Sequence, residues 1–125
     1  MNQHTCFICL GSNFDRETHM KAARRALTST FTDIRFGTEM VTEAIGNKFL
    51  SPFSNQVAIF CTALHTKEVR AILKQIEHDN GRLPEEKEYG IVKIDIDLLK
   101  YDDTVLKPND LKKDFVKAGI SKLLE

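Results

Sequence analysis

The sequence predicts a single α+β domain, residues 1–125, in which one antiparallel sheet carries two helices on one face, with a short helix near the C-terminus. Three observations support this prediction. A chain of 125 residues is within the usual size of one domain. Four segments have the composition or the alternation of β-strands, and two segments have apolar residues at helical spacing. Each of these two helices lies between two strands in the chain, which gives the βαββαβ order of the ferredoxin-like fold.

The first strand and helix are predicted near the N-terminus. Residues 5–10 form an apolar run, and the Gly-Ser-Asn sequence at 11–13 interrupts it, which predicts a buried strand followed by a turn. Asp15 can cap the segment that follows, and we expect a helix over residues 15–29. The apolar residues that recur there at spacings of three and four are Met20, Ala23 and Leu27.

The middle of the chain predicts two strands, a loop and a second helix. Residues 32–41 alternate loosely, as in a half-buried strand, and residues 43–52 contain Gly, Asn and Pro and predict a ligand-binding loop. Residues 56–64 are rich in β-forming side chains and predict a central strand. Thr66 can cap the second helix, which the Asn-Gly pair at 80–81 ends. Its apolar face consists of Val69, Ile72, Leu73 and Ile76.

The last predicted strand follows a polar loop. Residues 82–90 contain one proline and three glutamates, and we expect them to be mobile. Residues 91–101 then alternate cleanly between apolar and polar side chains. The apolar face is Ile94, Ile96 and Leu98, and the polar face is Lys93, Asp95 and Asp97. A turn at 102–103 follows, and apolar residues after Pro108 predict the short C-terminal helix.

Composition and charge argue against several classes of protein. Lys plus Arg is 18 and Asp plus Glu is 18, so no overall field attracts nucleic acid or an anionic membrane. The sequence shows no targeting segment and no apolar run near the roughly 20 residues that span a bilayer, so we expect a cytoplasmic protein. In a reducing compartment the three cysteines, Cys6, Cys9 and Cys61, are expected to be free thiols of the core.

Asp95 and Asp97 are the clearest chemical signal. If Ile94 and Ile96 pack under the helices, both carboxylates point to the opposite face of the sheet, which is predicted to be open. Two carboxylates at this spacing can converge on one Mg²⁺ ion, which takes one or two carboxylates and keeps its other positions for water and phosphate oxygens. Alternating acids on a strand are more often a solvated sheet face, so the pair needs further support.

That support comes from four motifs in a fixed order. Residues 10–13 read Leu-Gly-Ser-Asn, residues 53–57 read Phe-Ser-Asn-Gln-Val, residues 75–77 read Gln-Ile-Glu before a Gly-Arg pair at 81–82, and residues 94–97 read Ile-Asp-Ile-Asp. In their order and spacing these motifs resemble those of the hydroxymethyl-dihydropterin pyrophosphokinases. The resemblance implies transfer of pyrophosphate from ATP to the hydroxymethyl group of a reduced pterin, a step of folate synthesis.

The resemblance also implies a role for particular residues. Asp95 and Asp97 are expected to bridge two Mg²⁺ ions on the ATP phosphates, and Arg82 is expected to contact phosphate as the third catalytic residue. Glu77 and Lys93 are expected to join Arg82 in binding the nucleotide. The residues expected to bind the pterin, through two stacked rings, an amide and the loop backbone, are Thr42, Ile45, Phe53, Asn55 and Phe115. The alternative interpretation of these residues is structural: Phe53 and Phe115 would pack in the core, and Asn55 would be a turn residue.

The chain departs from the family in residues 82–92, which in the family carry several arginines and a tryptophan. Here that loop holds Pro84 and three glutamates, with Val92 at the position of the last arginine and Asp114 at that of another. Two alternatives therefore stay open beside an active enzyme that works as a monomer: a pterin- or nucleotide-binding module with impaired catalysis, and a structural module that pairs with another subunit through its open sheet face.

Overall fold

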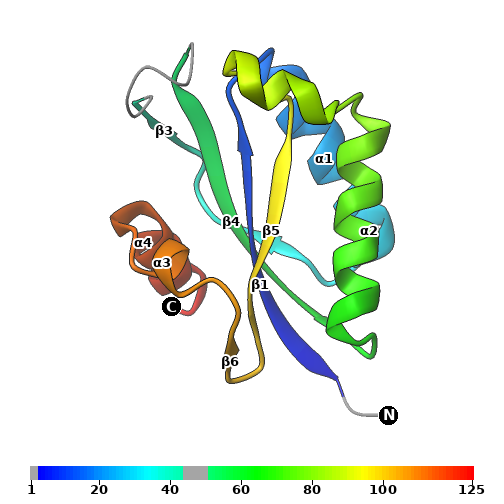
Figure 1. Cartoon of the computed structure of the whole chain (residues 1–125). Helices are drawn as coiled ribbons and strands as arrows, with labels where there is room; N and C mark the ends of the chain where they lie inside the picture. The colour runs from blue at the N-terminus through cyan, green and yellow to red at the C-terminus, as the bar shows by residue number, and fades with distance from the viewer. Residues whose placement is uncertain (1–2, 44–50) are drawn as a thin grey trace.

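The computed structural model describes residues 3–43 and 51–125, and within them it contains one antiparallel sheet of six strands (Figure 1). The strand order is β2-β4-β1-β5-β6, and β3 also pairs with β4. The strands are β1 (His4–Ser12), β2 (Arg35–Phe36), β3 (Met40–Thr42), β4 (Phe53–Thr62), β5 (Asp95–Tyr101) and β6 (Thr104–Val105). The helices are α1 (Arg16–Thr30), α2 (Thr66–Asp79), α3 (Pro108–Leu111), α4 (Asp114–Leu123) and the 3₁₀ helix η1 (Pro84–Tyr89). The predicted α+β class, the single antiparallel sheet and the βαββαβ core are confirmed.

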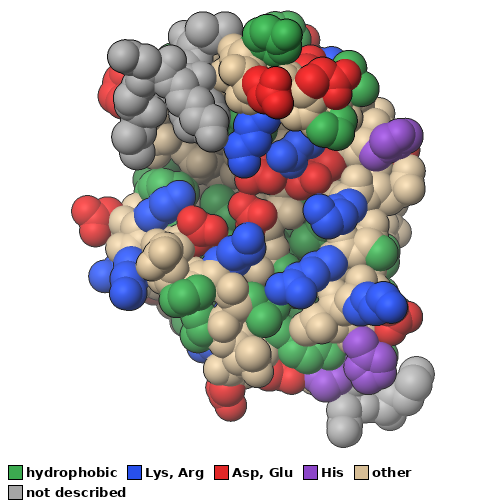
Figure 2. Space-filling model, in the orientation of Figure 1, with side chains coloured by type: hydrophobic (Ala, Val, Ile, Leu, Met, Phe, Trp, Pro, Cys, Tyr) green, Lys and Arg blue, Asp and Glu red, His purple; other side chains and the backbone are tan. Residues whose placement is uncertain are grey.

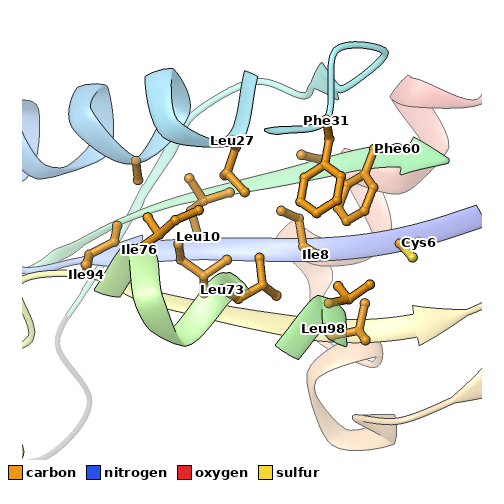
Figure 3. Packing of buried hydrophobic residues seen from close by; sticks show 14 of the residues in the cluster. Cys6, Ile8, Leu10, Leu27, Phe31, Phe60, Leu73, Ile76, Ile94 and Leu98 are labelled. Atoms are coloured by element: carbon orange, nitrogen blue, oxygen red, sulfur yellow. The ribbon is translucent and has the colours of Figure 1, made fainter. Parts of the chain in front are cut away.

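The main core lies between the sheet and the two long helices. Figures 1 and 3 show α1 and α2 on the same face of the sheet. The alternate residues of β1 that face them, Ile8 and Leu10, are fully buried, as predicted for a strand under two helices. Phe31 stacks on Phe60 with ring centroids 3.9 Å apart at one end of this core. Of the predicted apolar residues of the helices, Ile72 is only partly buried against this core, and the others belong to it: Met20, Ala23, Leu27, Val69, Leu73 and Ile76.

The opposite face of the sheet was predicted to be open, and this prediction is wrong. The helix α4 packs against part of that face (Figure 1). Buried residues from the sheet and from α4 form a second apolar cluster there: Phe7, Val57, Ile59, Leu99, Val116 and Leu123. Gly119 brings the helix backbone directly onto Val57 of β4. The chain thus covers with its own C-terminal helix much of the surface that the structural alternative reserved for another subunit.

The predicted strand over 32–41 is interrupted. Phe36 pairs with Ala58, and Met40 pairs with Asn55. Between these two pairs the chain advances four residues from β2 to β3 but only three residues along β4. The extra residue forms a bulge that separates β2 from β3. Within it, the Gly37 N–H donates to the Val57 carbonyl at 2.8 Å, which keeps the bulged segment against the sheet.

The predicted helix caps differ from the observed ones. Asp15 is the N-cap residue of α1, but its backbone is left-handed, with φ 45°, and its side chain makes no capping bond, which requires an extended N-cap. The N-cap residue of α2 is His65 and not Thr66, because Glu68 Oε1 accepts the His65 N–H at 3.1 Å. The end of α2 is as predicted, since Gly81 is left-handed with φ 80°.

Three further expectations need correction. Part of the polar segment 82–90 forms η1, and β5 begins only at Asp95, which pairs with Gly11 of β1. All three cysteines are free, but Cys61 is exposed, because it lies on the face of α4 beyond the part that this helix covers. Among the described residues, no helix is long and apolar enough to cross a membrane.

The contact between α4 and the sheet gives a prediction about stability. A Cβ atom at Gly119 would lie 2.9 Å from Val57 Cγ2 and 3.2 Å from Val57 Cβ. Gly119→Ala should therefore lower the free energy of unfolding by about 1–3 kcal/mol, although alanine favours a helix by about 1 kcal/mol over glycine. Combined with Val57→Ala, which makes room for the methyl group, the same substitution should be neutral or stabilising. Urea denaturation of the four proteins measures this coupling, and an equal loss in both backgrounds would contradict it.

Candidate active site

The register of the three central strands brings the predicted site residues together. Gly11 of β1 pairs with Asn55 of β4 on one side and with Asp95 of β5 on the other. Asp97 follows on the same face, opposite Cys9. A Cβ atom at Gly11 would lie 3.4 Å from Asn55 Oδ1, in van der Waals contact with the amide, and glycine leaves that space in the row unfilled. The row opens on the face of the sheet that carries α4.

A cavity of about 590 Å³ lies over this row, between the sheet and the C-terminal helices. Asn55 Nδ2 donates to Thr42 Oγ1 at 2.8 Å within it, which orients the amide. Ile45, which the resemblance also places at the pterin, lies outside the described residues. The predicted site residues that line this cavity are Thr42, Phe53, Asn55, Arg82, Asp95, Asp97 and Phe115.

A second cavity, of about 480 Å³, lies between α2 and β5. It is bordered by basic side chains, and Figure 2 shows Lys and Arg gathered around a hollow on this side of the molecule, with acidic side chains at its upper end. The basic residues that line the cavity, besides Arg82, are Arg70, Lys74, His78 and Lys107. Among them, Arg70, Lys74 and His78 repeat every four residues along α2, a signal that the sequence contained and that our predictions of site residues did not use.

Arg82, Asp95 and Asp97 line both cavities, so the two cavities adjoin at these side chains. Arg82 Nη1 lies 2.8 Å from Asp95 Oδ1 and 3.1 Å from Glu77 Oε1. Glu77 Oε2 in turn accepts the Ile96 N–H at 2.8 Å, which joins the end of α2 to β5. Burial raises the pKa of Glu77, and the Ile96 N–H and the charge of Arg82 offset part of this effect. The site thus holds its carboxylates with one arginine and one backbone donor.

The pKa values of the two aspartates are shifted in opposite directions from the ordinary value. Burial works against ionisation of Asp95, but hydrogen bonds from Asp97 and Arg82 outweigh it and lower the pKa of Asp95. Burial and the neighbouring charge of Asp95 raise the pKa of Asp97 to about 7. Near neutral pH Asp95 is therefore ionised, while Asp97 is only partly ionised because it lies beside that charge.

This pair has the donor chemistry that Mg²⁺ requires. Among the described residues, no group of three or more His, Cys, Asp or Glu side chains that could hold a metal ion is found. Magnesium needs only one or two carboxylates, and a divalent cation between Asp95 and Asp97 would relieve their repulsion. The residues present fit Mg²⁺ on this ground.

Asn13 holds the segment that precedes the acids, a function that our sequence reasoning did not assign to it. Its Nδ2 donates to the Gly90 carbonyl and its Oδ1 accepts the Val92 N–H, both at 2.7 Å. Its own N–H donates to the Val92 carbonyl at 3.0 Å. Asn13 is buried, so these bonds replace water and fix the chain just before β5.

Three further lysines near the aspartates, Lys87, Lys93 and Lys113, differ in whether they line a cavity. Lys93 pairs with Glu86 Oε2 at 3.2 Å and donates to the Gly81 carbonyl at 3.1 Å, and it is not among the described residues that line either cavity. Lys87 and Lys113 do line the larger cavity. They place positive charge in the cavity that Asp95 and Asp97 also line.

The raised pKa of Asp97 predicts how stability depends on pH without added metal. A carboxyl with a higher pKa in the folded state destabilises the fold increasingly as pH rises from about 4 to 7, and most above 7. Asp97→Asn removes this penalty, so its stabilising effect should be larger at pH 8 than at pH 5, by on the order of 1–2 kcal/mol, given that solvent reaches the site. The unfolding free energies measured at both pH values test this. Asp103→Asn, at an exposed turn, is the matched control, and an equal effect of Asp97→Asn at both pH values would contradict the prediction.

The chain was compared with curated proteins, with solved structures and with models of protein families. No curated relative matches the chain. The C-terminal domain of the MgtC protein from Mycobacterium tuberculosis is 10% identical, with a TM-score of 0.42, and the match covers 76% of this chain and 86% of that one. A de novo designed protein with a ferredoxin fold is 12% identical, with a TM-score of 0.32, and the match covers 85% and 88%. These TM-scores are too low to carry an assignment. Residues 7–125, in contrast, match the family model of 7,8-dihydro-6-hydroxymethylpterin-pyrophosphokinase, so the chain belongs to this family.

Proposed function

We propose that this protein transfers pyrophosphate from ATP to 6-hydroxymethyl-7,8-dihydropterin with the help of Mg²⁺. The observation that carries this proposal is the meeting of two cavities of different chemistry at Asp95 and Asp97. A transferase for two substrates needs two such sites with the reacting atoms between them. Membership of the pyrophosphokinase family supports the same reaction.

The larger cavity suits a flat heteroaromatic substrate. Phe53 and Phe115 provide aromatic surface, and the Asn55 amide presents a donor and an acceptor that can match the edge of a pterin ring. The bond from Asn55 to Thr42 fixes which way the amide points. The hydroxymethyl group of a pterin held in this way would point toward the aspartates.

The smaller cavity suits a polyphosphate. Arg70, Lys74, Lys107 and Arg82 carry positive charge on its walls, while the chain as a whole has a formal net charge of zero. These cations stand on the same walls as the carboxylates of Glu77, Asp95 and Asp97, so the positive charge available to the phosphates of ATP lies beside acids that Mg²⁺ would neutralise. Glu77 lies among these cations and contributes by holding Arg82.

The reaction can be written with the atoms in balance. The hydroxymethyl oxygen forms a bond to the β-phosphorus of ATP, and the bond from that phosphorus to the oxygen bridging the α-phosphate breaks. AMP leaves with the electron pair, and the hydroxyl proton passes to solvent. Asp95 and Asp97 would hold Mg²⁺, two ions by the family resemblance, which would neutralise phosphate charge. Arg82 and Lys107 would orient the phosphates.

A binding module with impaired catalysis is the second candidate, and one observation favours it. Where the family carries loop arginines, η1 presents Glu85, Glu86 and Glu88, and Val92 is buried against the turn of Asn13. An arginine on a transferring phosphoryl group contributes several powers of ten in rate. Lysines at 87, 107 and 113 supply charge but lack the two-pronged geometry of arginine.

The first test is the release of AMP. Purified protein with ATP, Mg²⁺ and the dihydropterin should form AMP and the pterin diphosphate, and Asp97→Ala should reduce the rate at least about 100-fold, because charge on the phosphates is then not neutralised. Asp103→Ala removes an equal charge at the exposed turn and should leave the rate unchanged. Absence of AMP above background at saturating Mg²⁺ would exclude the enzymatic proposal.

The second test separates the enzyme from the binding module by calorimetry. Asn55→Ala should weaken pterin binding about tenfold, because one oriented hydrogen-bonding amide is lost. Gln75→Ala removes an exposed amide that does not line the larger cavity, and it should have no effect. Pterin binding without AMP release would establish the binding module, and an Asn55→Ala variant with native affinity would show that the pterin binds elsewhere.

A further inference from the structure

The guanidinium of Arg82 has an unusual set of neighbours. Its Nη1 atom lies 2.8 Å from Asp95 Oδ1, 3.1 Å from Glu77 Oε1 and 3.2 Å from the Ile94 carbonyl oxygen. One nitrogen thus meets three oxygens from two different elements, α2 and the segment that enters β5. A group of oxygens that converge in this way is the environment of a bound cation, and here the side chain of Arg82 provides the cation.

The residues that carry these oxygens are placed by contacts that do not involve Arg82. Glu77 is fixed by the bond from Ile96 N–H to its Oε2, and Asp95 stands on β5 opposite Gly11 of β1. The backbone of Arg82 is anchored by its N–H, which donates to the Glu77 carbonyl at 3.2 Å, whereas its guanidinium stands at the end of a long side chain with several rotatable bonds and contacts these oxygens. The side chain of Arg82 is therefore the part of this group that can move while the oxygens stay.

We propose that Arg82 is a built-in counter-ion of Asp95, which a divalent cation displaces when it binds the aspartates. This inference rests on the magnesium site of the proposed function. A guanidinium and a divalent cation that share one carboxylate repel each other, so Arg82 weakens the binding of metal. After displacement Arg82 keeps Glu77 as its partner and turns about it into the smaller cavity.

A phosphate group in the smaller cavity would then provide Arg82 with a new partner. Binding of the metal and binding of an anionic ligand are coupled through this single side chain, because each favours the position of Arg82 that the other requires. Arg82 thus acts as a positioning residue for the metal in addition to the phosphate contact that the family resemblance gives it.

Metal binding without nucleotide tests the inference directly. Mn²⁺ is used as the probe, and free Mn²⁺ is measured by electron paramagnetic resonance. Arg82→Gln should bind Mn²⁺ about tenfold more tightly than the native protein, since the competing charge is gone. Arg82→Lys keeps the charge and should stay within about twofold of native. Arg25→Gln makes the same chemical change on the exposed side of α1 and should have no effect. Native or weaker affinity in Arg82→Gln would overturn the inference.

A second measurement uses the unaltered protein and so does not depend on the folding of a variant. Nuclear magnetic resonance of arginine side chains during a Mg²⁺ titration should show the Arg82 signal shifting as the ion binds. Arg24, whose Nη1 contacts Glu39 Oε1 at 2.8 Å and Gln56 Oε1 at 3.2 Å, is the internal control and should not shift. An Arg82 signal that stays constant up to saturation would show that the counter-ion is not displaced.

Asp97→Asn separates failure of this inference from failure of the proposed function. If Mn²⁺ binds and Asp97→Asn abolishes binding while Arg82→Gln has native affinity, only the counter-ion role is wrong. If neither the native protein nor Arg82→Gln binds Mn²⁺, the magnesium site is wrong and the inference falls with it. If the Arg82 results are as expected but AMP is not formed, the inference stands and the proposed reaction is wrong.

Discussion

The position of β1 at the centre of the sheet is the constraint on which the rest of the site depends. Its nine residues pair with β4 on one side, and most of them pair with β5 on the other. A slip of one residue in either pairing would turn the site residues of that strand into the core. The alternation along β1 prevents this, because Ile8 and Leu10 are fully buried under α1 and α2. Burial on one face of the sheet thus determines where Asn55 and Asp95 stand on the other.

Much of the fold was predictable because its signals are local. Alternation in 91–101 gave the correct faces for Ile96 and Asp97, and helical spacing gave the buried residues of α1 and α2. Apart from the helix caps, the larger errors concern features that depend on a partner distant in the sequence. The bulge between β2 and β3 is defined by the register against β4, and the packing of α4 on the sheet depends on the contact between Gly119 and Val57. Neither has a signature within its own segment.

The candidate site was predictable in its members but not in its contacts. Family motifs pointed to Asn55, Phe115 and the two aspartates, and the structure places all four around one cavity. The motifs gave no indication that Arg82 would contact Asp95, because residues 13 apart in the sequence are joined here through the end of α2 and the start of β5. The basic wall of the smaller cavity was also missed, since an exposed cation on a helix usually means only a solvated face.

The bonds of Asn13 have a consequence for the evolution of this chain. They fix the carbonyl of Gly90 and the backbone of Val92, while the bond from the Arg82 N–H to the Glu77 carbonyl fixes the other end of the same segment. The bonds at both ends of this segment lie outside η1. The bonds from the Asn13 side chain go to backbone atoms, so they do not depend on which side chains η1 carries. Natural selection can therefore replace the residues of η1 without moving the aspartates. The three glutamates of η1 can therefore stand in this stretch while Asn13 holds the backbone that leads to the aspartates.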